Sequence, residues 1–419
     1  MLGLISYRAL DEDRIFRGIT DLIDEKYKGS DAAEFYCSAV SDMAAAAERA
    51  GISGSIWHIW IALLIAKDES EYALSHERLS DVFGTLHDIA EYDLAKIYPY
   101  INADFSVIDA KLGVSAAQFI NGFVPSRTSS PLGGVAELSR GIANAGNACD
   151  LHRAVKKFYL GYGAGKFAVH CGFRWDAHER ALVPAAPLED ISLSSLFGYE
   201  EQKKTVVDNT LSFLEGRPSN NVLLYGEGGT GKSSTIKALL NEYAGRGLRM
   251  IEVYKHQIND LETILSLIKG RRYRFILFMD DLSFEPSELE YKYLKAFIEG
   301  GLERRPENVL IYATSNRRHL IKETWSDRTD KDDDMHESET MQEKMSLADR
   351  FGLLVRYFAP EQAEYLRIAR TLASEYGVPC DGVEFERGAI QWELRHGGFS
   401  GRSARQYIEH LAGKKSGSA

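Results

Sequence analysis

The chain has 419 residues, more than one hydrophobic core usually fills, so two or more domains are expected. Its hydrophobic fraction of 44% and charged fraction of 26% are typical of a soluble globular protein. A net charge of −11 does not support general binding to nucleic acid, although a local basic patch remains compatible with it. The longest apolar run, Ile56–Ala66, is about half the roughly 20 residues that span a bilayer, so it predicts a buried core helix and no membrane span.

The start of the chain and its cysteines indicate the compartment. The first residues lack the basic start and the small-residue cleavage site of a secretory signal. Cys37, Cys149, Cys171 and Cys380 are scattered, with no CxxC pair and no clustered histidines. We expect these thiols to be reduced and mostly buried. The sequence therefore predicts a cytoplasmic protein.

Residues 1–160 are predicted to form a helical N-terminal domain. This region shows no sustained alternation of period two, and Met43–Ala50 is a strong helix former closed by Gly51. Trp57 and Trp60 are expected to be core residues. Apolar residues at helical spacing predict helices over Ile56–Lys67, Leu79–Tyr98 and Ser115–Phe123.

Residues 161–192 are predicted to be a connector that contains strands. The segment Gly161–Gly165 (GYGAG) favours a structural turn over a phosphate-binding loop, because no helix is expected after it. Lys166–Trp175 predicts a strand, with Ala181–Pro184 as its partner. Prolines and alanines after Leu182 indicate a linker.

Residues 193–358 alternate strands with helices, which is typical of a parallel α/β sheet. The uninterrupted apolar run Phe275–Met279 favours a strand buried on both faces. The other predicted elements are strands over Asn221–Tyr225, Arg249–Tyr254 and Asn308–Thr314, and helices over Lys232–Tyr243, Asp260–Ile268 and Glu288–Glu299.

Three segments complete the predicted organisation. Glu323–Lys344 is acidic and almost devoid of aliphatic residues, so we expect a mobile loop there that proteases cut early. Residues 359–413 contain three helical patterns, and residues 414–419 form a flexible tail.

The segment from Gly226 to Ser233 matches the phosphate-loop pattern G-x-x-x-x-G-K-[ST], between an apolar strand and a helix. Glycines in such a loop let backbone N–H groups surround a phosphate, and the helix N-terminus adds partial positive charge. Lys232 is expected to reach the β- and γ-phosphates of a nucleotide, and Ser233 to ligate Mg²⁺. The candidate phosphate-binding residues are Gly226, Glu227, Gly228, Gly229, Thr230, Gly231, Lys232, Ser233 and Ser234.

Two carboxylates end the buried strand that begins at Phe275. Asp280 is expected to hold Mg²⁺, mostly through water, and Asp281 lies where a carboxylate can orient and deprotonate the attacking water. Glu285 is a second candidate for that base. A pair of aspartates at a strand end is common by itself. About fifty residues after a phosphate loop, however, such a pair indicates a nucleoside triphosphatase.

The chain contains no N-K-x-D motif for guanine, which favours ATP over GTP. Leu196–Tyr199 (LFGY), ahead of the phosphate-loop strand, offers Phe197 and Gly198 as part of an adenine pocket. A plain turn before a helix is the alternative for this segment.

Together these residues resemble the AAA+ ATPases over about Leu193–Gly413. The phosphate loop and the Asp280-Asp281 strand resemble Walker A and Walker B. Asn316, in Ala313-Thr-Ser-Asn316, is similar to sensor 1, which implies an amide that positions the hydrolytic water.

Two further segments carry the resemblance to AAA+ proteins. Ser346–Gly352 (SLADRFG) resembles the segment with the arginine finger, which implies that Arg350 acts on a neighbouring subunit's nucleotide. Gly401-Arg402-Ser-Ala404 resembles sensor 2 in a helical lid, with Arg405 as the next candidate.

More closely, the chain resembles a bacterial AAA+ family catalogued only as a domain of unknown function. The strings that carry this resemblance are NVLLYGEGGTGKSS (221–234), FMDDLSF (278–284), YATSNRRHL (312–320) and LADRFG (347–352). The resemblance implies an ATPase and implies no particular substrate.

Two departures from the AAA+ pattern bear on function. The second Walker B carboxylate is Asp281, where many AAA+ enzymes have Glu; replication-initiator and helicase-loader ATPases resemble this chain there. The shorter side chain favours slower hydrolysis. Tyr254-Lys-His-Gln257 lacks the aromatic-hydrophobic-glycine tripeptide of protein unfoldases, which argues against polypeptide threading.

Two basic segments have open interpretations. The cluster Lys269–Arg274 (KGRRYR) favours a solvated turn over a nucleic-acid contact. Arg317-Arg318-His319 is equally compatible with a subunit interface and with a solvated loop.

The sequence thus predicts an α/β AAA+ module with a parallel sheet and a C-terminal helical lid, after a mainly helical N-terminal domain. The expected function is Mg²⁺-dependent ATP hydrolysis coupled to remodelling or loading of a macromolecular partner, which the N-terminal domain would recognise. A DNA-handling loader is one form of this prediction. The alternative is an ATP-dependent switch or scaffold with very slow hydrolysis. Arg350 predicts a homo-oligomer.

Overall fold

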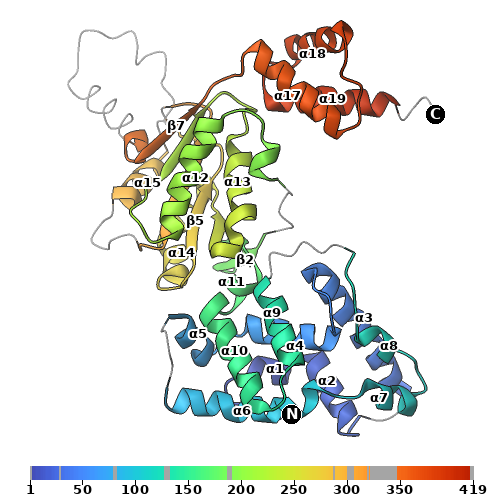
Figure 1. Cartoon of the computed structure of the whole chain (residues 1–419). Helices are drawn as coiled ribbons and strands as arrows, with labels where there is room; N and C mark the ends of the chain where they lie inside the picture. The colour runs from blue at the N-terminus through green and yellow to red at the C-terminus, as the bar shows by residue number, and fades with distance from the viewer. Residues whose placement is uncertain are drawn as a thin grey trace. The chain divides into compact units, whose positions relative to one another are not determined.

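The structure is a computed structural model that describes residues 2–27, 30–78, 83–126, 133–185, 191–285, 288–299, 306–318, 320 and 347–415. The predicted loop Glu323–Lys344 and His319 lie outside these residues. The chain divides into two compact units. We call Met1–Cys171 with Gly270–Tyr273 the helical unit, and Gly172–Lys269 with Arg274–Ala419 the sheet unit (Figure 1).

The helical unit confirms the predicted helical N-terminal region. Its one recorded strand-like feature in the described residues is an isolated bridge between Gly54 and Phe123. Its helices are α1 (Arg8–Glu12), α2 (Arg14–Ile23), α3 (Ser30–Ala50), α4 (Ile56–Lys67), α5 (Glu71–Arg78), α6 (Thr85–Ile101), α7 (Phe105–Leu112), α8 (Ala117–Ile120), α9 (Gly133–Ala143), α10 (Ala148–Tyr162) and α11 (Lys166–Val169).

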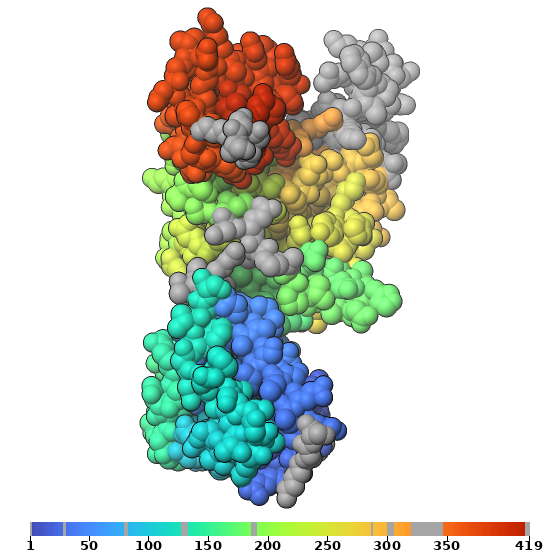
Figure 2. Space-filling model, turned by 90° about the vertical axis from the view of Figure 1, so that its right-hand side faces the viewer, coloured from blue at the N-terminus to red at the C-terminus, as the bar shows by residue number. Residues whose placement is uncertain are grey.

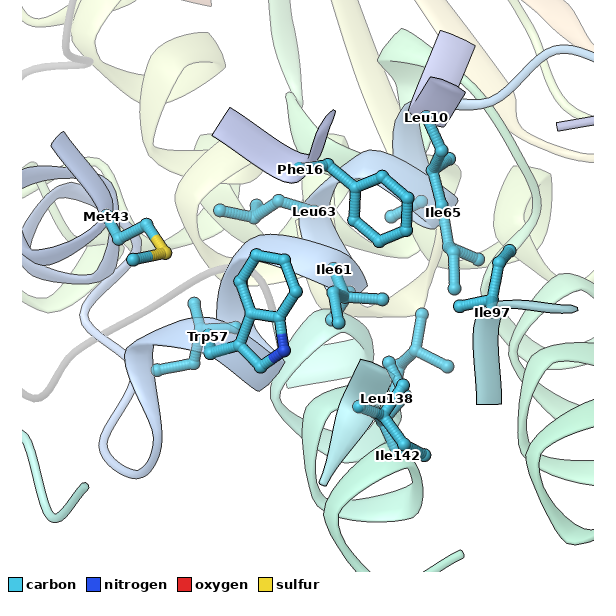
Figure 3. Close-up of a cluster of buried hydrophobic side chains, with 14 of the residues drawn as sticks. Leu10, Phe16, Met43, Trp57, Ile61, Leu63, Ile65, Ile97, Leu138 and Ile142 are labelled. Atoms are coloured by element: carbon cyan, nitrogen blue, oxygen red, sulfur yellow. The ribbon is translucent and has the colours of Figure 1, made fainter. Parts of the chain in front are cut away.

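Helix α4 is the centre of this unit. It is apolar on all sides, and such a helix is stable in water only if its neighbours cover it all round. Trp57 is fully buried, stacks on Phe16 of α2 with ring centroids 5.7 Å apart, and donates from its indole N–H to the Tyr100 carbonyl (2.9 Å). Figure 3 shows these rings beside Ile61 and the α9 residue Leu138. The predicted core helix is confirmed.

The predicted connector differs from the structure at its start. Lys166–Val169 forms the short helix α11 instead of a strand, because Phe167 and Val169 bury their side chains within the helical unit. Strand β1 (Gly172–Asp176) begins later and pairs antiparallel with β2 (Ala181–Pro184), as expected for that pair. Both strands belong to the main sheet, and the division between the units falls after Cys171.

The basic cluster before strand β5 is not a solvated turn throughout. Arg271 is buried in the helical unit, where its guanidinium donates to Glu77 (2.6 and 2.9 Å) and to the Ala164 carbonyl (2.6 Å). Sequence reasoning missed this role because Glu77 is almost two hundred residues away along the chain. The buried pair makes Gly270–Tyr273 a structural part of the helical unit.

The prediction that the cysteines are mostly buried is wrong. Cys37 and Cys149 are exposed, Cys171 and Cys380 are partly exposed, and none of these four cysteines forms a disulfide. Within the described ranges, no helix is long and apolar enough to cross a membrane.

The sheet unit contains a seven-stranded sheet in the order β2-β1-β4-β5-β6-β3-β7. All neighbouring strands are parallel except β1 and β2, which confirms the predicted α/β class. The remaining strands are β3 (Val222–Gly226), β4 (Leu248–Glu252), β5 (Arg274–Met279), β6 (Val309–Ser315) and β7 (Leu353–Tyr357).

The central strands are covered on both faces, as parallel strands normally are. All seven residues of β6 and five of the six in β5 are buried. The helices and short 3-10 turns of this unit before the lid are α12 (Glu200–Leu214), α13 (Lys232–Tyr243), α14 (Leu261–Ile268), α15 (Glu290–Glu299), η1 (Leu193–Ser195), η2 (Ala244–Arg246) and η3 (Lys255–Asp260). Strand β7 was not predicted, because Arg356 interrupts its apolar pattern.

The last three helices have a hydrophobic cluster of their own, as predicted for a helical lid. They are α17 (Gln362–Glu375), α18 (Val383–His396) and α19 (Gly401–Lys415). Tyr365, Leu372 and Ile408 are buried in this cluster, and Phe197 packs against it from the segment before α12. Figure 2 shows these helices in red, lying against green residues of the same unit.

Candidate nucleotide-binding site

Three central strands end at one edge of the sheet and bring the candidate residues together. Strand β6 lies between β3, which leads into the phosphate loop, and β5, which is followed directly by Asp280-Asp281. Because all three strands are parallel, their carboxyl ends share one edge, where open α/β sheets bind ligands.

The phosphate loop needs its glycines for steric reasons. Gly226 has φ +135°, and a Cβ atom there would lie 1.9 Å from the Tyr357 carbonyl oxygen on β7. Gly229 has φ +75°, and its Cβ would lie 3.0 Å from the Arg402 Cβ. Close packing against the Tyr357 backbone on one side and the Arg402 side chain on the other therefore leaves no room for a Cβ atom at either glycine of the loop between β3 and α13, which begins at Lys232.

Lys232 is buried inside the loop and bonded to both sides of it. Its ammonium donates to the carbonyls of Gly226 (2.9 Å) and Glu227 (2.7 Å) and to the Asn316 side-chain oxygen (3.2 Å). Burial lowers the pKa of Lys232, while the negative charges of Asp281 and Asp280 oppose that shift. The lysine thus links the phosphate loop to the end of β6.

Asp280 is fixed by two hydroxyl groups. Ser233, in the first turn of α13, donates to its Oδ1 at 2.5 Å, and Thr314 of β6 donates to the same oxygen at 2.6 Å. A serine hydroxyl beside a carboxylate is an oxygen donor set of the kind that Mg²⁺ prefers. No cluster of three or more His, Cys, Asp and Glu side chains suited to a metal occurs in the described part of the chain, so phosphate and water oxygens would have to complete such a site.

Asp281 follows the strand in a left-handed backbone conformation, with φ +48°. Asp and Asn tolerate this region better than other residues with a side chain. Its backbone N–H donates to the Thr314 hydroxyl (2.8 Å), and its carboxylate accepts from the Asn316 amide (2.8 Å). The Asn316 amide therefore joins Asp281 to Lys232, with its oxygen and nitrogen assigned by these two bonds.

A cavity of about 470 Å³ extends from this edge to the segment before α12. At the phosphate-loop end it is lined by Gly228–Thr235, Asp280, Asp281, Thr314 and Asn316. At the other end it is lined by Ile191, Ser195, Leu196, Phe197, Gly198, Tyr199, Lys203, Ile368 and Leu372. The first group is polar and rich in glycine, and the second is mostly apolar, so the two ends suit phosphate and a flat ring, respectively.

The apolar end is held by tyrosine and lysine contacts. Tyr199 stacks on Tyr357 with ring centroids 4.8 Å apart and donates from its hydroxyl to the Phe358 carbonyl (2.6 Å). Burial raises the pKa of Tyr199 to about 12. Lys203, which is buried, donates to the Leu196 carbonyl at 2.6 Å.

The lid reaches the phosphate loop directly. The backbone N–H of Arg402, in the first turn of α19, donates to the Gly229 carbonyl at 3.2 Å. Arg402 and Arg405 both line the cavity, so the lid contributes two arginines to its wall.

Some predicted residues lie outside the cavity wall. Gly226 and Glu227 contribute carbonyls to Lys232 and are not part of the lining. Arg350 is also outside it and pairs with Glu299 of α15 at 3.0 Å, a partner that the sequence did not indicate. The second candidate base, Glu285, does not line the cavity either.

Sequence reasoning missed Thr314 and Lys203, whereas Tyr199 belongs to the predicted segment Leu196–Tyr199. Thr314 stands in the same short segment as Asn316, and its hydroxyl two residues ahead of that amide was the available signal. Lys203 gave no signal, because lysines are common on exposed helix faces and only the fold buries this one.

Comparison with known proteins gives the family. Residues 168–415, more than half of the chain, match the family described as "Protein of unknown function (DUF815)". The chain belongs to this family. No curated protein matches it.

Two solved structures match part of this chain at low sequence identity. A Thermotoga maritima RuvB P216G mutant is 19% identical with a TM-score of 0.35, and the match covers 52% of this chain and 64% of that one. The FIGL-1 AAA domain in complex with ADP is 17% identical with a TM-score of 0.36, covering 53% and 73%. The strand order, the phosphate loop and the helical lid are those of the AAA+ fold.

Proposed function

We propose that this DUF815 protein binds Mg-ATP in the cavity at the carboxyl edge of its sheet and hydrolyses it. The observation that carries this proposal is the Asn316 amide, which bonds both Lys232 and Asp281. All three side chains line the cavity. A link between Lys232 and Asp281 at this place is not needed for the stability of the fold, so we assign it to the chemistry of the site. Phosphate would bind the loop amides and the N-terminus of α13, with Lys232 turning from the loop carbonyls to the β- and γ-phosphates.

The residues present fit a magnesium ion. Ser233 and Asp280 would hold it together with phosphate oxygens and water, since their oxygens already lie 2.5 Å apart. The ion would neutralise charge on the phosphates.

Hydrolysis requires a base and a group that orients water. Asp281 is the proposed base, since it lines the cavity next to Asp280, and Asn316 would hold the water beside that carboxylate. The attacking water would pass a proton to Asp281 while the water oxygen forms a bond to the γ-phosphorus. The bond between the γ-phosphorus and the oxygen that bridges it to the β-phosphorus would break, so that ADP and phosphate leave. Arg402 of the lid would stabilise the phosphate charge, with Arg405 as the alternative.

The apolar end of the cavity suits the adenine ring. Phe197 and Gly198 line it from the segment before α12, and Ile368 and Leu372 line it from the lid helix α17. Because loop and lid share this end, adenine binding would draw α17 toward the sheet. ATP binding and lid closure are therefore coupled in this proposal.

Arg350 is proposed to act on the nucleotide of a neighbouring copy. It lies outside the cavity of its own chain and carries a charge that cannot be removed at neutral pH. Its pairing with exposed Glu299 is of the kind that contributes little to stability, so the arginine can exchange that partner for phosphate. The active form would be a homo-oligomer.

The work done is proposed to be remodelling or loading of a macromolecular partner that the helical unit recognises. The acidic charge of the chain does not favour nucleic acid as that partner. The rival is a switch that binds ATP and hydrolyses it very slowly, which the short side chain of Asp281 favours. A cytoplasmic location remains our expectation.

Steady-state phosphate release by the purified chain tests the proposal, with Lys232→Ala as the inactive reference. Turnover above that reference supports an ATPase. Tight ATP binding without turnover, with or without candidate partners, supports the switch. A folded wild-type protein that binds no ATP would overturn both.

A further inference from the structure

Thr314 makes a two-sided contact at the end of strand β6. Its side chain is 2% exposed, its hydroxyl donates to Asp280 Oδ1 (2.6 Å), and the same oxygen accepts the Asp281 backbone N–H (2.8 Å). The Thr314 carbonyl accepts the Leu282 N–H at 2.7 Å. One residue of β6 therefore bonds three successive residues that follow β5.

These bonds use the Thr314 hydroxyl both as a donor and as an acceptor. A threonine hydroxyl has one proton and two lone pairs, so it can donate to a carboxylate and accept a peptide N–H at once. Valine has the same shape and can do neither. The position is thus chemically specific, although an apolar β-branched residue would fit the buried strand equally well.

The contacts set the geometry of two carboxylates with different tasks. Asp280 Oδ1 receives hydroxyl protons from both Ser233 and Thr314, which fixes its rotamer beside the α13 hydroxyl. Asp281 is held at φ +48° by its N–H bond to Thr314 and by the bond of the next residue to the Thr314 carbonyl. Without the hydroxyl, that N–H would lose its recorded partner, and the turn would be free to relax.

We propose that Thr314 is a positioning residue of the ATP site, acting through Asp280 on magnesium and through Asp281 on the attacking water. This inference rests on the proposed ATPase function. Groups that hold a metal ligand in place commonly contribute 10- to 100-fold to metal affinity or activity. The same hydroxyl serves both carboxylates, so its loss should change magnesium dependence and turnover together.

The test compares Thr314→Val with Thr314→Ser and with a matched control, Thr210→Val. Thr210 is also a buried threonine of this unit, bonds the Tyr312 hydroxyl (2.8 Å), and does not line the cavity. The measurements are the half-saturating Mg²⁺ concentration for ATP binding by calorimetry, the affinity for ATP in EDTA, kcat, and the melting temperature.

Thr314→Val is expected to raise the half-saturating Mg²⁺ about tenfold and to lower kcat about tenfold or more. Its ATP affinity in EDTA should stay within about twofold, because the phosphate loop is intact. Thr314→Ser keeps the hydroxyl and should remain within about threefold of wild type in both values. Thr210→Val should lower the melting temperature only.

A folded Thr314→Val protein with wild-type Mg²⁺ dependence would overturn the inference while leaving the ATPase proposal standing. Equal effects of Thr210→Val would also overturn it, because they would indicate general destabilisation. If the valine variant does not fold, Thr314→Ala supplies the same comparison. Absence of ATP binding by the wild-type protein would instead remove the proposed function itself.

Discussion

The two ends of the cavity are built in different ways. At the phosphate end, the side chains form two hydrogen-bonded series. Asp280 accepts from Ser233 and Thr314. Asn316 donates to Asp281 and accepts from Lys232. At the other end, Phe197, Ile368 and Leu372 supply mainly apolar surface. The phosphate end requires particular functional groups at fixed positions, whereas the apolar end requires only side chains of suitable size and shape.

This difference explains what could be read from the sequence. Phosphate chemistry restricts residue type and spacing, so Gly226–Ser233 and Asp280-Asp281 were recognisable as strings. Apolar contacts accept many side chains, so the segment with Phe197 was also compatible with a plain turn. Ile368 and Leu372, from the distant helix α17, were not predicted at all.

The comparison also suggests where substitutions act. Changes at the phosphate end should affect turnover strongly and in a charge-specific way, and changes at the other end should affect nucleotide affinity modestly. The predictions below run from the largest expected effect to the smallest.

Substitution of Arg350 tests whether one chain alone supplies all the groups of the phosphate end. If it completes a neighbour's site, Arg350→Ala should lower turnover by about 10³-fold or more with little change in ATP affinity. Glu299→Gln is the matched control, because it removes the recorded ion-pair partner and keeps the arginine. If the pair were only a surface contact, both variants would change stability by less than about 1 kcal/mol and leave turnover intact.

An experiment that mixes two inactive variants tests whether Arg350 acts on the nucleotide of a neighbouring subunit. Arg350→Ala and Asp281→Asn are each expected to be inactive, but a mixed oligomer contains interfaces with an intact Asp281 site and a neighbour's intact arginine. Turnover should then partly return. No recovery despite demonstrated co-assembly would exclude action on a neighbouring copy.

Asp281→Asn separates binding from chemistry at the phosphate end. The substitution keeps a similar volume and removes the base, so turnover should fall about 100-fold or more while ATP still binds. Asparagine also tolerates the left-handed backbone at this position, which keeps the turn. Glu285→Gln, outside the cavity wall, serves as the control. Wild-type turnover by Asp281→Asn would move the base elsewhere, and a loss in Glu285→Gln would point to that residue.

Lys232→Ala should weaken ATP binding by about tenfold or more, because a hydrogen-bonded ammonium facing the phosphates is lost. Lys237, five residues later on α13, provides the control Lys237→Ala on the same helix. Calorimetry of both folded proteins is the measurement. Unchanged ATP affinity in Lys232→Ala would show that the phosphate site is wrongly assigned.

The elements of the fold also differ in how well the sequence predicts them. Strands β5 and β6 could be predicted because burial on both faces makes them continuously apolar. Strand β7 and helix α11 could not, since an exposed Arg356 breaks the first pattern and a short helix cannot be told from a strand by a few apolar residues. The Arg271–Glu77 pair is a product of the tertiary fold alone.

The smallest expected effect lies at the apolar end, at Lys203. Its ammonium donates to the Leu196 carbonyl (2.6 Å) and to Glu200 (2.9 Å), which holds the segment that carries Phe197. Loss of one such bond typically changes free energy by about 1 kcal/mol, so Lys203→Met should weaken ATP binding about fivefold. Inorganic tripolyphosphate lacks the ring and should bind Lys203→Met as it binds the wild type.

Lys204 offers a control of the same chemistry, because it is the next residue on α12 and is exposed. Lys204→Met should leave the affinities for ATP and tripolyphosphate unchanged. If Lys203→Met weakened both ligands equally, the lysine would act on the phosphate end through its charge, and the division of the cavity into two ends would fail. Weaker binding of ATP alone would instead establish that this buried lysine shapes the apolar end of the cavity. The change in affinity would be far smaller than the losses of turnover expected for the Arg350 and Asp281 variants.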